Sequence, residues 1–182
     1  MLYNCANPYD ELLGSKRKFE LKKSLEVKVG EILRQRGQRL AVAESCTGGL
    51  ISHLVTNVAG SSAYFVGSVT AYANEAKVHL LGVHQETLEK FGAVSSETVI
   101  EMAHGVRKAL AADIGISVSG IAGPDGGTPD KPVGTVWIGL SSPQQEYARH
   151  FLWTGDRLDV KVQSAQAALM LLLEYLQEEK PC

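Results

Sequence analysis

Residues 39–49, "RLAVAESCTGG", join a short apolar run to a polar turn that contains two glycines. Every side chain of the run "LAVA" is apolar, and successive side chains of a strand point to opposite faces. Such a strand favours burial on both faces, which is typical of a sheet covered by helices. The stretch therefore predicts a buried strand at residues 39–44, followed by a helix from about Thr47.

Helix and strand patterns alternate along the rest of the chain. Residues 142–145, "SPQQ", have the length of a hairpin connection and predict that the flanking strands are antiparallel. Helices are expected at residues 21–37, 47–58, 74–83, 96–112 and 157–176, and strands at 39–44, 61–72, 114–120, 133–141 and 146–153. The pattern predicts an α/β fold, a three-layer α/β/α sandwich with a mixed sheet in a single domain. We expect this domain to span residues 20–182, after an N-terminal extension at residues 1–19.

The composition limits the classes of partner. A formal net charge of −2 gives no overall positive field for a nucleic acid, so no nucleic-acid partner is expected. The basic run at residues 15–23 is typical of a solvated tail or helix face. Three cysteines without a C-x-x-C pair favour reduced thiols. No apolar run approaches the roughly 20 residues that span a bilayer, and no secretory signal pattern occurs, so we expect a cytoplasmic protein without membrane contact.

The turn "ESCTGG" at residues 44–49 has three candidate roles. Ser45 could be a nucleophile, the glycines could cradle a phosphate, or the stretch could only connect a strand to a helix. Gly48 and Gly49 at a helix start would leave backbone N–H groups open to a phosphate or to a developing oxyanion. Neither the phosphate-loop pattern nor G-x-G-x-x-G occurs in the chain. These six residues alone leave the choice open.

A lysine stands in an unfavourable position after the second expected strand. Asn74 is a natural N-cap, so Lys77 would lie in the first helical turn, where the helix dipole disfavours a cation. A lysine there that is also partly desolvated has a lowered pKa and can act as a general base. Tyr72 could share the pocket as a hydroxyl donor or proton relay. The alternatives are that Lys77 points to solvent and that Tyr72 packs in the core.

Cys46 is the rival nucleophile to Ser45. Cysteine–histidine chemistry needs a histidine within reach, and the five histidines of the chain are scattered without metal-ligand spacing. We therefore interpret Cys46 as a small core residue and expect no metal site. A serine activated by a lysine is the most economical pairing.

Four motifs in series resemble one family. They are "AESCTGG" at residues 43–49, "YANEAK" at 72–77, "GAVS" at 92–95 and "SGIAGPDGGTPDKPVGTVW" at 119–137. Together they resemble the C-terminal domain of the competence/damage-inducible protein CinA, also found alone as the nicotinamide mononucleotide deamidase PncC. The resemblance implies a homodimer that hydrolyses the carboxamide of nicotinamide mononucleotide to nicotinate mononucleotide and ammonia, without a metal or other cofactor, in pyridine nucleotide recycling.

The resemblance also implies roles for individual residues. Ser45 would be the nucleophile, Lys77 its base, and Tyr72 would assist proton transfer. A wider set would bind the substrate or the developing oxyanion: Thr47, Gly48, Gly49, Asn74, Gly120, Gly123, Thr128, Gly134, Thr135 and Arg157. Within this set, Arg157 could pair with a phosphate through both guanidinium arms.

Two positions depart from the family pattern. Ala73 stands where serine is common, and Lys161 stands near a recurring second arginine. The first change removes a hydrogen bond beside the base, and the second weakens a fork-like anion clamp. The leading hypothesis is a nicotinamide mononucleotide deamidase that uses Ser45 and Lys77. The alternative is a catalytically weak nucleotide-binding or interaction module of the same family.

Overall fold

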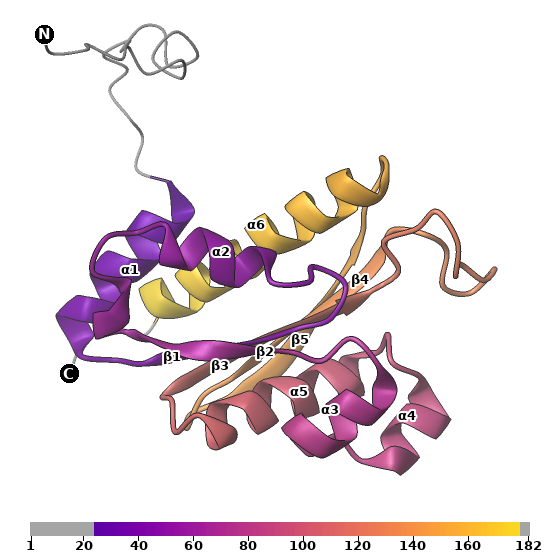
Figure 1. Ribbon diagram of the computed structural model, residues 1–182, viewed down its shortest axis with the longest axis horizontal. Helices are drawn as coiled ribbons and strands as arrows, with labels where there is room; N and C mark the ends of the chain where they lie inside the picture. Colours follow the sequence, from indigo (N-terminus) through magenta and orange to yellow (C-terminus); the bar gives the residue numbers. More distant parts are fainter. Residues whose placement is uncertain (1–23, 179–182) are drawn as a thin grey trace, which may run out of the picture.

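Figure 1 shows a sheet between two layers of helices in the computed structural model, which describes residues 24–178. The helices are α1 (Leu25–Arg36), α2 (Leu50–Thr56), α3 (Asn74–Leu81), α4 (Gln85–Phe91), α5 (Ser96–Ala109), α6 (Arg157–Glu178) and the short 3-10 helix η1 (Ser61–Ala63). The strands are β1 (Leu40–Glu44), β2 (Phe65–Thr70), β3 (Ile114–Gly120), β4 (Thr135–Ser141) and β5 (Glu146–Leu152). The predicted extension at residues 1–19 and the predicted helix start at residue 21 lie outside the described residues.

The five strands form one mixed sheet in the order β2-β1-β3-β4-β5. β1 is parallel to both β2 and β3, whereas β4 is antiparallel to β3 and to β5. The β4–β5 pairing confirms the hairpin predicted at residues 142–145. Because β1, β2 and β3 are parallel, their carboxyl ends lie at the same edge of the sheet, and the loops that follow them meet there.

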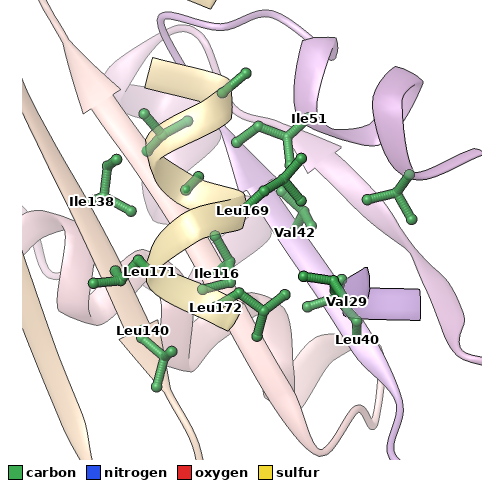
Figure 2. Close-up of a cluster of buried hydrophobic side chains, with 14 of the residues drawn as sticks. Val29, Leu40, Val42, Ile51, Ile116, Ile138, Leu140, Leu169, Leu171 and Leu172 are labelled. Carbon is green, nitrogen blue, oxygen red and sulfur yellow. The ribbon is translucent and has the colours of Figure 1, made fainter. Parts of the chain in front are cut away.

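The helices cover both faces of the sheet, so the predicted α/β/α sandwich is confirmed. Figure 1 shows α1, α2 and α6 on one face and α3, α4 and α5 on the other. Alternate side chains of β1 enter two separate clusters. Leu40 and Val42 belong to the cluster drawn in Figure 2, which includes side chains of α1, α2 and α6. Ala41 and Ala43 pack instead with side chains of α3, α4 and α5, so β1 has the double burial that its sequence predicts.

Several element boundaries differ from the prediction. α2 begins at Leu50 rather than Thr47, because the residues before it form a separate turn. α5 ends at Ala109, and Ala111 has a positive φ of 48° that is incompatible with a continued helix. The helix α4 was not predicted, since its seven residues are too few to establish a helical period. Gly37 does end α1 in the left-handed conformation, with φ 64°, as predicted.

α6 is the longest helix, with 22 residues. Its inner face is buried against the sheet and contributes Leu169 and Leu172 to the cluster in Figure 2. Its outer face exposes Asp159 and Gln166, so the helix is amphipathic, although the same face also exposes the apolar Val162 and Met170. Within residues 24–178, α6 and the other helices all fall short of the combination of length and apolarity needed to cross a bilayer.

Candidate active site

A cavity of about 210 Å³ lies where the loops after β1, β2 and β3 meet. Residues that the sequence singled out border it together: Ser45, Tyr72, Asn74, Lys77, Gly120 and Arg157. They come from four separate segments, and the parallel arrangement of β1, β2 and β3 brings three of these segments to one edge of the sheet. The fold therefore brings the proposed nucleophile and the proposed base to one cavity.

Lys77 is almost completely buried, with 1% of its surface exposed. Its Nζ donates hydrogen bonds to the backbone oxygens of Ala71, at 3.0 Å, and Tyr72, at 3.1 Å. Burial lowers the pKa of the Lys77 ammonium, because the charged form loses its hydration. The prediction that Asn74 is the N-cap is wrong: Ala73 holds that position and no side chain caps α3. Lys77 is thus the fourth helical residue, and burial rather than a first-turn position explains its lowered pKa.

Ser45 directly follows β1 and keeps the strand's hydrogen bonding. Its backbone N–H donates to the oxygen of Val118 at 3.0 Å, which extends the pairing of β1 with β3 by one residue. The side chain is buried except for 7% of its surface, which borders the cavity. Within residues 24–178 the Ser45 hydroxyl has no hydrogen-bond partner. A backbone held by the sheet thus presents a hydroxyl that is free to react with a bound molecule.

The turn after Ser45 differs from the predicted anion cradle. Glu44 is fully buried, and its Oε2 accepts hydrogen bonds from the hydroxyl of Thr47, at 2.7 Å, and the N–H of Gly49, at 2.9 Å. The N–H of Gly48 donates to the oxygen of Ser45 at 3.2 Å. The prediction that these glycines leave N–H groups open to an anion is therefore wrong, because both N–H groups already donate to oxygens of Glu44 and Ser45. The hydroxyl of Thr47 is likewise committed to Glu44.

Arg157 links two of the loops that surround the cavity. Its Nη2 donates to the hydroxyl of Tyr72 at 2.9 Å, and its Nη1 donates to the oxygen of Gly123 at 2.7 Å. Tyr72 is 60% exposed, so the alternative that it packs in the core is wrong. The guanidinium therefore lies at the cavity rim, between the loop after β2 and the long loop after β3.

A second, larger cavity of about 580 Å³ adjoins the first and shares Ala122 and Arg157 with it. Lys161 also borders this second cavity. Arg157 and Lys161 are four residues apart on α6, so both lie on the same side of the helix. The second cavity thus has two cationic side chains and one carboxylate, that of Asp156, on its wall.

Three of the predicted binding residues shape the long loop and border neither cavity. The N–H and hydroxyl of Thr128 both bond with the backbone of Lys131, at 2.9 and 3.0 Å. The buried hydroxyl of Thr135 donates to the oxygen of Pro132 at 2.7 Å. Gly134 has a φ of +94°, and a Cβ there would lie 2.0 Å from the backbone oxygen of Trp153. In this structure these residues fix the loop conformation, so any effect on a ligand is indirect.

Cys46 lies in the hydrophobic core, as the sequence predicted. It is 5% exposed, belongs to the same apolar cluster as the inner face of α6, and also borders the smaller cavity beside Ser45. Burial raises the pKa of the Cys46 thiol to about 12, so the thiolate that nucleophilic attack requires is scarce at neutral pH. The rival assignment of Cys46 as nucleophile is thereby weakened.

The family model for the CinA C-terminal domain matches residues 22–176. The chain belongs to the CinA C-terminal domain family. A CinA-like protein from Thermotoga maritima is 51% identical over 152 residues, which cover 84% of this chain and 37% of that protein. A CinA-like protein from Salinibacter ruber is 51% identical over 146 residues, covering 80% of this chain and 35% of that protein. The chain thus matches little more than a third of the length of these relatives.

Solved structures of the CinA superfamily have the same fold. A CinA superfamily protein from Klebsiella pneumoniae aligns with a TM-score of 0.82 at 38% identity, over 85% of this chain and 96% of the other. The competence/damage-inducible protein CihA from Agrobacterium tumefaciens aligns with a TM-score of 0.80 at 35% identity, over 87% of this chain and 99% of the other. These matches confirm the resemblance inferred from the four motifs.

Two residues of this CinA-family site escaped the sequence analysis. Glu44 accepts the hydrogen bonds of the donors in the turn. In the sequence, the only sign of this role is a carboxylate at the end of an otherwise apolar strand. Ser119 also borders the cavity, and its hydroxyl donates to the oxygen of Ala93 at 2.7 Å. That hydrogen bond joins the end of β3 to the segment before α5, which forms another part of the cavity wall. Both segments lie within the motifs at residues 92–95 and 119–137, but nothing in the sequence shows that they contact each other.

Proposed function

We propose that this chain is an amidohydrolase that uses Ser45 as nucleophile and Lys77 as base to remove ammonia from the carboxamide of nicotinamide mononucleotide. The observation that carries the proposal is that an unpartnered serine hydroxyl and a buried lysine with a lowered pKa border one cavity. Ordinary serine and lysine side chains lack this reactivity, because the first is a weak nucleophile and the second is protonated at neutral pH.

The hydrogen bonds of Lys77 favour its use as a base. A neutral amine has two N–H donors and one lone pair. The oxygens of Ala71 and Tyr72 accept two hydrogen bonds from Nζ, which directs the remaining position of the nitrogen away from both carbonyls. In the neutral form this remaining position is the lone pair, which can accept the proton of Ser45 Oγ across the cavity.

The reaction divides into two steps. Ser45 Oγ attacks the carboxamide carbon while its proton passes to Lys77 Nζ. The carbon–nitrogen bond then breaks, and the Lys77 ammonium returns the proton to the leaving nitrogen as ammonia. Water adds to the resulting ester, again with Lys77 as base, and Ser45 departs with the proton. The sum is amide plus water giving carboxylate and ammonium, with no other reactant.

The developing oxyanion needs donors other than those of the turn after Ser45. The first turn of α3 borders the cavity at Asn74, and no side chain caps it, so the N–H groups that precede that of Lys77 have no capping side chain to compete with a ligand. Asn74 is the first residue of this turn and also carries a side-chain amide. We assign oxyanion stabilisation to this end of α3.

The two adjoining cavities suit a nucleotide whose two ends differ in chemistry. The smaller cavity holds the proposed reactive pair and would take the carboxamide ring. The larger cavity has Arg157 and Lys161 on its wall and would take the phosphate through charge-assisted hydrogen bonds. Arg157 borders both cavities, which makes it the natural contact for the part of the substrate that joins the ring to the phosphate.

Ammonia release from nicotinamide mononucleotide by the purified chain tests the proposal. We expect steady release by the wild type, with a loss of roughly 10³-fold or more in both Ser45→Ala and Lys77→Ala. Lys108→Ala, which removes an exposed lysine of α5, is the matched control and should retain full activity. Equal rates in the wild type and Ser45→Ala would refute the enzymatic assignment, and full activity in Lys77→Ala would refute the assigned base.

One observation favours the second candidate, a nucleotide-binding module with weak turnover. Among residues 24–178, no hydrogen bond joins Lys77 to Ser45. Calorimetry with the mononucleotide, followed by product analysis of the same sample, separates the candidates. Tight binding with intact substrate would support the module, and complete conversion would exclude it.

A further inference from the structure

The carboxylate of Glu44 is fully buried directly before Ser45 and is surrounded by donors. Besides the bonds from Thr47 and Gly49, its Oε2 accepts from the N–H of Ile51 at 3.1 Å. Its Oε1 accepts from both the N–H, at 2.9 Å, and the hydroxyl, at 2.6 Å, of Ser52. One carboxylate therefore receives five hydrogen bonds from the turn and from the first residues of α2.

The charge of Glu44 is balanced by these donors and not by a counter-ion. Within residues 24–178, no lysine, arginine or histidine forms an ion pair with it. Burying a carboxylate without hydrogen-bond partners costs on the order of several kcal/mol. The five donors, together with the positive end of the α2 dipole, offset that cost. Each donor that is lost raises the cost of burying the carboxylate, so the five bonds together favour this one conformation of the turn.

The backbone of Glu44 is fixed as firmly as its side chain. It pairs with Thr70 of β2 on one side and Val118 of β3 on the other. The N–H of Ala71, the residue before Tyr72, donates to the oxygen of Glu44 at 2.9 Å. Gly48 and Gly49 have φ values of +62° and +99°, which allow the chain to fold back over the carboxylate.

We infer that Glu44 is a positioning residue that holds the Ser45 hydroxyl at the cavity that Lys77 also borders. Its backbone holds the end of β1 between β2 and β3, and its side chain holds the start of α2. Ser45 stands between these two anchors, so its orientation follows from theirs. The inference rests on the proposed function. Glu44 would act only through Ser45, without touching the substrate.

Glu44→Gln is the direct test, because the amide has nearly the same shape as the carboxylate. Whichever way the amide is turned, its NH₂ faces at least one backbone N–H, that of Ser52 or those of Gly49 and Ile51, and loses those bonds, whereas a facing hydroxyl can reverse and accept. We expect kcat to fall by about 100-fold while KM changes by less than about threefold, measured where circular dichroism shows folded protein. The pH profile should keep its shape, because Lys77 remains the base. An unchanged kcat, or a shifted profile, would overturn the positioning role.

Two further variants separate positioning from general stability. Ser117→Ala removes another fully buried hydroxyl, which bonds to the oxygen of Val99 on the far side of β3 from the turn. It should lower the unfolding temperature and leave kcat unchanged. Ser52→Ala keeps the Glu44 charge and removes one of its five donors, so kcat should fall by about threefold to tenfold. If Glu44→Gln does not fold, an unchanged kcat in Ser52→Ala overturns the inference.

A fluorophosphonate probe distinguishes failure of this inference from failure of the proposed substrate. The probe phosphonylates a reactive serine oxygen with loss of fluoride, and mass spectrometry identifies Ser45 as the labelled residue. If the wild type is labelled but releases no ammonia from the mononucleotide, the proposed substrate is wrong, and slower labelling of Glu44→Gln still supports positioning. Equal labelling rates in both, or an unlabelled wild type, would overturn the inference about Glu44.

Discussion

At the scale of single residues, Lys77 combines a titratable amine with almost complete burial. Its N–H bonds to the oxygen of Ala73 and its Nζ to two further backbone oxygens, so both ends of the residue are held. In the sequence, Lys77 is misplaced because the dipole at a helix start disfavours a cation. Burial is the larger cause, since desolvation penalises the ammonium form whatever the direction of the helix.

The lowered pKa of Lys77 predicts a pH dependence of stability. Below its folded pKa the buried ammonium carries a desolvation cost that the unfolded chain avoids. Above the usual lysine value of about 10.5, the amine is neutral in both states. We therefore expect the wild type to gain stability relative to Lys77→Met as pH rises from neutral towards this value, by about 1.4 kcal/mol for each unit of lowering. Urea unfolding of both proteins at several pH values measures the gain, and a constant difference would contradict it.

At the scale of elements, α1 and the segment before β2 approach each other unusually closely. A Cβ placed on Gly30 of α1 would lie 2.4 Å from the hydroxyl oxygen of Tyr64. Tyr64 is 1% exposed, and within residues 24–178 its hydroxyl has no hydrogen-bond partner. A glycine that weakens the helix locally therefore permits a tight contact between two elements.

We predict that Gly30→Ala lowers the free energy of unfolding by about 1–3 kcal/mol, although alanine is the better helix former. Tyr64→Phe alone should be nearly neutral, because it removes a hydroxyl without a partner. The double variant should recover part of the loss, since the closest atom has been removed. Chemical denaturation of the three variants measures this coupling, and strictly additive effects would show that the contact is not the cause.

At the scale of the whole molecule, apolar side chains gather on the outer face of α6. Leu158 and Val162 lie four residues apart on one side of the helix and are 65% and 38% exposed. Leu158 also borders the larger cavity. An exposed apolar stripe beside a cavity is a candidate for contact with a second copy of the chain.

The homodimer implied by the family resemblance stays a prediction, and we place its interface at this stripe. Light scattering after gel filtration should give twice the 19.6 kDa of one chain for the wild type. Leu158→Asp and Val162→Asp should shift the mass towards one chain, because an interface that buries a carboxylate is strongly disfavoured. Leu80→Asp, at a leucine of α3 that is 55% exposed, is the control and should leave the mass unchanged. A wild-type mass of one chain would refute the prediction.

Much of the fold was determined by the sequence. The uninterrupted apolar run of β1 required cover on both faces, and the four-residue connection at 142–145 required an antiparallel pair. Gly37 marked the end of α1 because only glycine adopts the left-handed conformation there without strain. These features depend on the periodicity and conformational preferences of neighbouring residues, which are local properties of the chain.

The site was decided by contacts between residues far apart in the sequence. Ser45 and Lys77 were candidates from local patterns, but only the parallel alignment of β1 and β2 brings them to one cavity. The predicted anion cradle was wrong because the carboxylate of Glu44 already accepts the hydrogen bond of the Gly49 N–H at the helix start. Burial and hydrogen-bond partners depend on which elements pack together. The sequence therefore determined the elements and the candidate reactive residues, while tertiary packing determined which donors remain free and which amine loses its water.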